Sequence, residues 1–210
     1  MSCRGCRNRA AAFIWARLGR RTRCYNRSSS SAGLPGRPSY CGTFSGDADM
    51  PLTAAERATM IERYAHGPTL LKRALAKIPA DALKWKPASG KWSAHEIVVH
   101  CADAETNAHM RLRYLIAEPD PVIVGYDQDG WALAFDYHAH PLDLALATVE
   151  AVRANTLPLL KRMTVQDWQK TGRHTESGRY ATEDWLAIYA EHLEKHSRQL
   201  ERNLAGWNSR

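Results

Sequence analysis

The stretch from Thr182 to about Asn203 constrains the fold of this chain more than any other. Its apolar side chains recur at the spacing of one helix face, and they are Trp185, Leu186, Tyr189, Leu193 and Leu200. We expect Thr182 to cap this helix, because a threonine hydroxyl accepts a hydrogen bond from an N–H group left unpaired at a helix start. His192 and His196 lie four residues apart within the apolar stripe, so their rings point together into whatever the helix packs against.

Three further helices are expected. The first runs from Thr53 to about Ile78, and Gly67-Pro68 in its middle should kink or split it, because proline lacks a backbone donor. The second starts at Ser93, which forms a capping box with Glu96, and ends near Ala117. The third has Pro141 at its first position and ends near Met163.

The stretches between these helices show no clear period. Residues 119–140 form a long crossover connection, and residues 164–180 form a loop or a short helical turn. No internal repeat occurs, and no run of alternating apolar residues predicts a sheet. The pattern therefore predicts an all-α protein, a four-helix bundle formed by residues 50–210.

Inward-facing histidines point to a metal site. His100 shares a face of the second helix with Ile97, Ala104, Ala108 and Leu115, whereas His95 and His109 project from the opposite side. Buried imidazoles need partners, and one cation bound by His100, His192 and His196 would supply them. For any single ring, a core histidine bonded to a carbonyl oxygen stays the alternative.

Three neutral nitrogen ligands with an open fourth position are typical of a catalytic rather than a structural site. Zn²⁺ and Ni²⁺ are the ions we expect, with Fe²⁺ and Mn²⁺ as alternatives, because affinities and geometries overlap. Glu96 and Asp103 lie on the face of His100, four residues before and three after it, and we expect them to orient its ring.

Other candidate residues give weaker signals. His95 and His100 are five residues apart and face different sides, unlike the histidines of a zincin HExxH motif. We expect His138 and His140 at the surface, His174 in a loop, and Cys101 as a small buried side chain rather than a nucleophile.

Charge and cysteine content exclude several classes of protein. The formal net charge is +7, but residues 1–49 hold nine Arg and two Asp, which leaves 20 basic and 20 acidic residues in the rest. The folded part is thus neutral and predicts no direct nucleic-acid binding. Four of the five cysteines also lie in residues 1–49, so we expect no disulfide framework and a reducing compartment, the cytoplasm. No apolar run is long enough to predict a membrane span.

Residues 1–49 are rich in Arg, Ser and Gly and are expected to be disordered. Three interpretations stay open. Met50 is the functional start and the extension matters little; or the Arg-rich, acid-poor segment is a targeting sequence; or Cys3-x-x-Cys6 binds metal, although a second cysteine pair is lacking.

Two motifs resemble those of the DinB-like superfamily, in its branch of metal-dependent hydrolases and bacillithiol transferases. They are Trp92-Ser93-x2-Glu96-Ile97-x2-His100-x2-Asp103 and Thr182-x-Glu-Asp-Trp185-x3-Tyr189-x2-His192-x3-His196-x2-Gln199. The resemblance spans about Met50 to Trp207. It implies an up-down-down-up four-helix bundle, a homodimer, and a metal site made by His100, His192 and His196.

The same resemblance implies a metal-dependent transferase that joins a low-molecular-weight thiol to an electrophilic small molecule. A free thiol has a pKa of about 8.5 and loses its proton when a metal binds it. The alternatives are a hydrolase, in which water with a pKa near about 7 takes the open position, and a non-catalytic metal-bound stress protein. Asp103, Glu96 and Tyr189 are the candidates for proton transfer.

Overall fold

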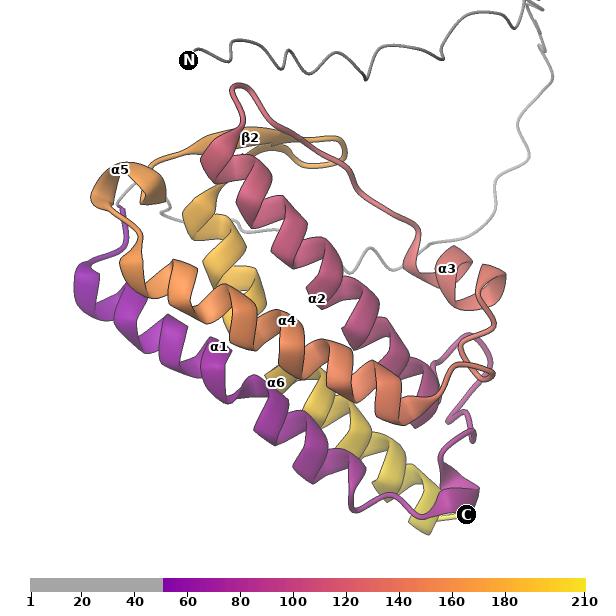
Figure 1. The fold of residues 1–210 in the computed structure, drawn as a ribbon. Coiled ribbons are helices and arrows are strands. Elements are labelled where there is room, and N and C mark those ends of the chain that lie inside the picture. The colour runs from indigo at the N-terminus through magenta and orange to yellow at the C-terminus, as the bar shows by residue number, and fades with distance from the viewer. Residues whose placement is uncertain (1–50) are drawn as a thin grey trace, which may run out of the picture. The chain divides into compact units, whose positions relative to one another are not determined.

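Four long helices form a bundle in the computed structural model, which describes residues 51–210 (Figure 1). They are α1 (Ala54–Leu75), α2 (Ala94–Ala117), α4 (Leu142–Arg162) and α6 (Thr182–Asn208). Both α1 and α2 pack against α4 and α6 and so occupy opposite corners of the bundle. α1 and α6 run in one direction and α2 and α4 in the other, which confirms the up-down-down-up bundle. The expectations for residues 1–49 lie outside the described residues.

Short elements fill the connections. A 3₁₀ helix, η1, covers Ala80–Ala82, α3 covers Gln128–Ala134, and α5 covers Val165–Trp168. Strands β1 (Val122–Ile123), β2 (Thr171–His174) and β3 (Gly178–Ala181) form a sheet in the order β1-β2-β3.

The sheet joins the two long connections of the chain. β1 pairs with β2 in parallel, with Ile123 opposite His174, and β2 pairs with β3 as an antiparallel hairpin. The sequence-based expectation of no sheet is therefore wrong. Its strands are two to four residues long, too short for an alternating pattern to show. β3 leads directly into α6, so the hairpin lies at the start of the helix that carries two of the three histidines.

Helix α1 is continuous through Pro68, so the expected split is absent. The helix ends at Leu75, three residues before the predicted end at Ile78. Proline has no N–H to donate to the carbonyl four residues earlier, which here belongs to Tyr64. The side chain of Arg153 on α4 supplies the missing donor, with Nη1 2.5 Å from the Tyr64 carbonyl oxygen. A contact from another helix thus stabilises the position where the local sequence is weakest.

The other helix starts agree with the sequence to within a residue. The capping box of Ser93 and Glu96 and the end of α2 at Ala117 are confirmed. Pro141 is the N-cap of α4 rather than its first residue. Thr182 is not the cap of α6: Ala181 takes that position and its N–H donates to Asp184, while the Thr182 hydroxyl donates to the Lys170 carbonyl.

Two apolar clusters make up the core. The Trp185 cluster contains Ile61, Tyr64, Leu112, Leu160, Trp185 and Leu186. The Leu193 cluster contains Leu71, Ile97, Val98, Val149, Leu193 and Leu200. Each long helix contributes residues to both clusters. The position between its two sets is Gly67 in α1, Glu105 in α2, Arg153 in α4 and His192 in α6, and these positions form a polar layer between the clusters.

A buried ion pair occupies this polar layer. The side chains of Arg153 and Glu105 are 2% and 0% exposed, and two hydrogen bonds of 2.9 and 2.6 Å join them. Arg153 also donates to the carbonyl of Tyr189 on α6 at 2.8 Å. One side chain of α4 therefore bonds to α1, α2 and α6. Removing one member of such a pair leaves a buried charge and costs about 3–5 kcal/mol of folding stability.

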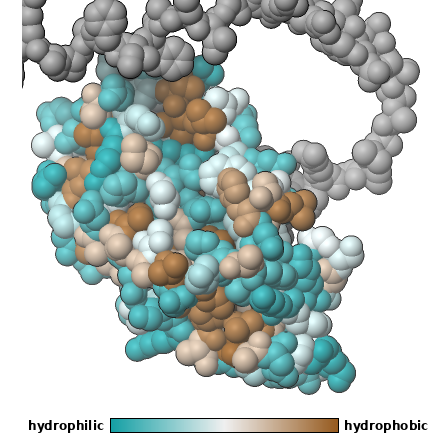
Figure 2. Space-filling view, turned by 45° about the vertical axis from the view of Figure 1, so that its right-hand side comes forward, coloured by the Kyte–Doolittle hydropathy of each residue, from teal (hydrophilic) through white to brown (hydrophobic). Residues whose placement is uncertain are grey.

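The face of the molecule in Figure 2 is largely hydrophilic and carries separate apolar patches. Val124, Leu133 and Phe135 of the crossover are among the exposed large apolar side chains of the described residues. Of the helices in residues 51–210, none has the length and apolar character needed to cross a bilayer. The homodimer stays a prediction.

The contact between Gly67 and Arg153 gives a test of this packing. A Cβ at Gly67 would lie 2.5 Å from Nη1 of Arg153 and 3.1 Å from Cβ of Leu193. Gly67→Ala should thus lower the free energy of unfolding by about 1–3 kcal/mol through overpacking, although alanine is normally the better helix former by roughly 1 kcal/mol. Urea unfolding measures the change.

The matched control is Gly206→Ala in α6, where a Cβ meets only the outer ring edge of Trp85, at 3.1 Å. We expect this variant to be between equally stable and about 1 kcal/mol more stable than the wild type, because the gain in helix propensity is opposed only by this contact. Equal effects of the two substitutions would contradict a specific fit between Gly67 and Arg153.

Candidate metal centre

Three histidine side chains converge between α2 and α6. Each offers one ring nitrogen, and these nitrogens all lie within 4.8 Å of one another. The ring centroid of His100 lies 5.6 Å from that of His192 and 4.9 Å from that of His196. The centroids of His192 and His196 are 4.7 Å apart. His100 is buried, whereas His192 and His196 are half-buried, so the rings of α6 are the more exposed part of the cluster. We call these three side chains the triad.

Hydrogen bonds fix which nitrogens of α6 face the triad. Nδ1 of His192 lies 2.9 Å from an oxygen of Glu105, and Nδ1 of His196 lies 2.9 Å from Oε1 of Gln199. Both partners are acceptors, so each Nδ1 carries the proton and each Nε2 presents a lone pair. Nδ1 of His100 is buried and has no hydrogen-bond partner among the described residues.

Burial keeps two of these rings neutral. It lowers the pKa of His196 to about 3, and the nearby His192 adds to the effect. The pKa of His100 is also held well below its usual value by burial and by the proximity of His196 and His192. Neutral imidazole is the form that binds metal.

The triad fits a divalent ion on three counts: the neutral rings of His100 and His196, an unsatisfied buried nitrogen of His100, and acceptors behind the rings of His192 and His196. Zinc–nitrogen distances of about 2.0–2.1 Å put the nitrogens of a tetrahedral site roughly 3.3 Å apart. The rings therefore need to approach by about 1.5 Å at most, which side-chain rotation can supply. His100, His192 and His196 are the residues that would hold such an ion.

Two aromatic rings line the triad. The ring of Trp92 lies 4.6 Å from that of His100, and the ring of Tyr189 lies 5.7 Å from that of His192. Tyr189 belongs to the same face of α6 one turn earlier, and its side chain is 4% exposed. Trp92 and Tyr189 therefore limit the space in which a small molecule could approach the histidines.

Glu96 and Asp103, which were expected to orient His100, have other partners. The Glu96 carboxylate accepts hydrogen bonds from the Ser93 N–H at 2.8 Å and from Lys86 at 2.7 Å. Asp103 accepts a hydrogen bond of 2.5 Å from the hydroxyl of Tyr137. The ring of His100 thus lacks the carboxylate partner that its helix face suggested.

The remaining histidines lie apart from the triad. His95 bonds to the carbonyl of His140, and His138 bonds to the hydroxyl of Ser93. His109 bonds to Thr156. His174 ends β2, and its Nδ1 accepts a hydrogen bond from the N–H of Glu176. Cys101 is buried, and burial raises the pKa of its thiol well above the usual value, as expected for a structural cysteine.

The sequence reading missed Glu105 and Arg153. Glu105 links the triad to the core, because its carboxylate bonds both to His192 and to Arg153. Both residues break an apolar stripe: Glu105 lies between Cys101 and Ala108, and Arg153 lies four residues after Val149. Two opposite charges on the buried faces of different helices are the signal that could have revealed the pair.

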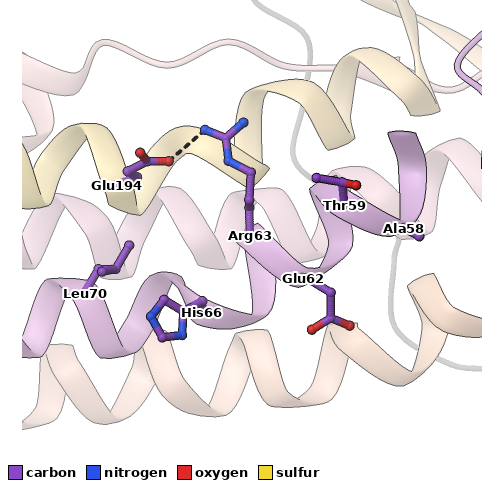
Figure 3. A pocket seen from close by; sticks show the side chains of 7 residues that line it. All are labelled: Ala58, Thr59, Glu62, Arg63, His66, Leu70 and Glu194. Atoms are coloured by element: carbon purple, nitrogen blue, oxygen red, sulfur yellow. Dashed lines mark hydrogen bonds and ion pairs between the residues drawn. The ribbon is translucent and has the colours of Figure 1, made fainter. Parts of the chain in front are cut away.

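A hollow of about 670 Å³ lies elsewhere, along α1 (Figure 3). Its lining includes His66, Leu70 and the ion pair of Arg63 with Glu194. Glu194 follows His192 by two residues and so projects from nearly the opposite side of α6. The hollow is therefore separate from the triad, and chemistry rather than concavity identifies the candidate site.

Comparisons with known proteins show the family of this chain. The sequence model of the DinB superfamily matches residues 63–200. The chain belongs to the DinB superfamily. A protein of Oceanobacillus iheyensis is 33% identical over 129 residues, which cover 61% of this chain and 74% of that protein. A protein of Bacillus licheniformis is 29% identical over 175 residues, which cover 80% of this chain and 96% of that protein. Both are named "Putative metal-dependent hydrolase".

Solved structures agree with the DinB-like fold. YfiT from Bacillus subtilis is described as "a probable metal-dependent hydrolase with an unusual four-helix bundle topology". It superposes with a TM-score of 0.70 at 21% identity, over 77% of this chain and 94% of YfiT. TT2238, a four-helix bundle protein, superposes with a TM-score of 0.50 at 20% identity, over 70% of this chain and 98% of TT2238. At these identities the likeness concerns the fold alone.

The lowered pKa values predict how acid affects the metal-free protein. In the unfolded chain a histidine takes up a proton near about pH 6.5, whereas folded His100 and His196 resist protonation. Stability is thus fully present above about pH 6.5 and falls as the pH drops from there toward the lowered pKa values, by about 1 kcal/mol per pH unit for each ring. Urea unfolding in the presence of a chelator, from about pH 8 to about pH 5, measures this slope.

His196→Gln should make the slope shallower because one titrating ring is gone. The matched control is His66→Gln, which removes an exposed histidine and should leave the slope unchanged. Equal slopes for the wild type and His196→Gln would contradict the prediction.

Proposed function

We propose that this DinB-superfamily protein binds a divalent metal ion with His100, His192 and His196, and transfers a low-molecular-weight thiol to an electrophilic small molecule. The convergence of the three rings on one point carries the proposal. A bound ion supplies the Lewis acidity that turns a thiol into a thiolate near neutral pH.

The protein's own residues have separate tasks in this proposal. Glu105 accepts from Nδ1 of His192 and Gln199 from Nδ1 of His196, so both rings hold one tautomer and one orientation. Arg153 keeps Glu105 ionised: despite burial, this partner and His192 lower the pKa of the carboxyl below its usual value. In the transfer, the thiol sulfur would form a bond to the electrophilic carbon, the leaving group would depart with its electron pair, and the thiol proton would go to solvent.

The carboxylates of α2 favour a thiol over water as the nucleophile. Glu96 is bonded to Lys86 and a backbone N–H, Asp103 to Tyr137, and Glu105 to Arg153 and His192. Glu96 and Glu105 thus have both carboxylate oxygens in hydrogen bonds, and Asp103 has one, which makes each of them a weaker general base. Coordination alone deprotonates a thiol, so thiol transfer needs no such base.

Of the three predicted proton-transfer residues, Tyr189 lies beside the triad. Burial raises the pKa of its phenol, and Arg111 donates a hydrogen bond to the phenol oxygen. Tyr189 therefore stays protonated and can donate a proton or a hydrogen bond to a departing group, but it is a poor base. Roles for Asp103 and Glu96 stay predictions.

The second candidate function is hydrolysis, in which water replaces the thiol. The names of the relatives support it, since they describe metal-dependent hydrolases. The neutral charge of residues 50–210 supports a small-molecule substrate rather than nucleic acid. A cytoplasmic location stays a prediction.

Metal binding is tested by substitution of one ligand. The wild type should bind one equivalent of Zn²⁺ or Ni²⁺, and His192→Gln should weaken binding by more than about a hundredfold. Glu105→Gln should weaken it by about tenfold to a hundredfold, because a partner of the ligand is lost. Competition with a chromophoric chelator measures both. His109→Gln is the matched control, since it removes a histidine of α2 whose partner is Thr156; a loss of affinity as large as that of His192→Gln would overturn the site.

Thiol transfer is tested with monobromobimane as the electrophile. The metal-loaded protein should accelerate formation of the fluorescent thioether, and chelation or His192→Gln should abolish the acceleration, because thiolate formation requires the ion. A p-nitrophenyl ester serves as a hydrolase substrate in a parallel assay. Metal-dependent ester hydrolysis without thioether formation would overturn the transferase in favour of the hydrolase.

A further inference from the structure

A second cluster of polar side chains adjoins the triad. It contains Arg111 of α2, Tyr126 of the crossover, Tyr180 of β3 and Tyr189 of α6. Arg111 donates to the hydroxyl of Tyr189 at 3.1 Å and to the carbonyl of Val124 at 2.6 Å. Its guanidinium carbon lies 5.9 Å from the centre of the Tyr126 ring. Three segments that are distant in the sequence thus bring one cation and two phenols together, and Tyr180 lies close enough for the charges of Tyr189 and Arg111 to act on the pKa of its hydroxyl.

Donors in this cluster exceed acceptors. The hydroxyls of Tyr126 and Tyr180 are buried, and neither has a hydrogen-bond partner among residues 51–210. Leaving a buried hydroxyl unpaired costs about 1–3 kcal/mol, so two in one place call for an acceptor that the chain itself does not provide. The Tyr180 side chain is only 5% exposed, which leaves bulk water little access to it.

Arg111 also lacks a carboxylate partner within the described part of the chain. Arg57, Arg63 and Arg153 each form an ion pair with a glutamate. Arg111 instead donates to a carbonyl and a phenol, both of them neutral. A guanidinium in this setting retains its full attraction for an anion.

The acidic groups around the cluster are turned to other partners. Asp103 accepts from Tyr137, and Asp184 accepts from the N–H of Ala181. Glu176 is exposed, and its carboxylate packs against Gly125, the neighbour of Tyr126 in the crossover. Burial raises the pKa values of Tyr126 and Tyr180, so both hydroxyls stay protonated and act as donors. A ligand here would meet hydrogen-bond donors and one positive charge.

The cluster is continuous with the triad. Tyr189 belongs to it through Arg111, and the ring of Tyr189 lies 5.7 Å from that of His192. Arg111 and Tyr126 are half-buried and form its accessible edge. A small molecule of a few carbon atoms could therefore have one end at the histidines and the other end at Arg111.

We propose that Arg111, Tyr126, Tyr180 and Tyr189 form a subsite that binds the carboxylate of the small-molecule substrate whose reactive group lies at the triad. The planar guanidinium and the phenol hydroxyls match the two acceptor oxygens of a carboxylate. The position of the reactive group rests on the proposed function, whereas carboxylate binding does not. The substrate class is thus a carboxylated thiol or a carboxylated electrophile.

Two thiols of similar size test the subsite. 3-Mercaptopropionate carries a carboxylate, and 2-mercaptoethanol carries a neutral hydroxyl. Isothermal titration of the full-length protein, both metal-free and metal-loaded, should give about tenfold to a hundredfold tighter binding of 3-mercaptopropionate, the effect of charge-assisted hydrogen bonds. The Michaelis constants of the two thiols in the monobromobimane assay should differ in the same direction, with kcat nearly equal.

Arg111→Met should abolish this preference and leave the Zn²⁺ affinity unchanged. Arg113→Met is the matched control, because it removes the same charge two residues along α2, where the partners are the His109 carbonyl and Asn155. Tyr126→Phe removes one hydroxyl with little change of shape and should reduce the preference several-fold. It also serves if Arg111→Met does not fold.

The outcomes separate this proposal from the metal chemistry. Equal affinities of the wild type for the two thiols, or a preference that survives both Arg111→Met and Tyr126→Phe, would overturn the subsite and leave its hydroxyls as binders of water. Absence of thioether formation with the carboxylate preference intact in the metal-free protein would overturn the transferase and keep the subsite.

Discussion

The buried pair of Arg153 and Glu105 is the interaction on which the rest of the structure depends. It lies where all four helices pass from the Trp185 cluster to the Leu193 cluster, and Arg153 bonds to each of the other three. Ionised groups are costly to bury, and the cost is offset here because four of the five N–H donors of the guanidinium have an acceptor. Two features of α1 make room for it: Gly67 has no Cβ to meet Nη1, and Pro68 leaves the Tyr64 carbonyl without its helical donor.

This arrangement couples the fold to the site. One oxygen of Glu105 accepts from both Arg153 and His192, so the carboxylate that holds the bundle together also fixes the tautomer of a triad ring. Hydrogen bonds in such a chain polarise one another at low dielectric, and each becomes stronger than it would be alone. A change in the packing around Arg153 would therefore reach His192 without any change in the triad itself. Metal affinity and folding stability should vary together in this layer and independently elsewhere.

Sequence patterns predicted the bundle and the convergence of the three histidines because both follow from helix periodicity. His192, His196 and His100 lie on apolar stripes, and the packing of these stripes brings them together. The same reasoning assigned Glu96 and Asp103 to His100 by spacing along one helix, but Lys86 and Tyr137, from segments without periodicity, hold these carboxylates instead. Periodicity identifies the face of a side chain, whereas its partner depends on tertiary contacts. The small sheet and Glu105 were missed for that reason, since β1 and β2 come from separate connections and Arg153 lies 48 residues from Glu105.

The two halves of the candidate site also differ in what supports them. The triad stands on α2 and α6 alone, and the helices of the bundle hold its rings in position. Tyr126 belongs to the crossover, just after β1, and Tyr180 belongs to β3. Strand β2 pairs with both β1 and β3 and so joins these two segments in one sheet. Binding specificity can change with residues of loops while the scaffold that carries the chemistry remains intact. The sheet thus has a physical role that a bare four-helix bundle lacks: it joins the connection that contains Tyr126 to the hairpin that contains Tyr180, the two segments that supply hydroxyls to the proposed subsite.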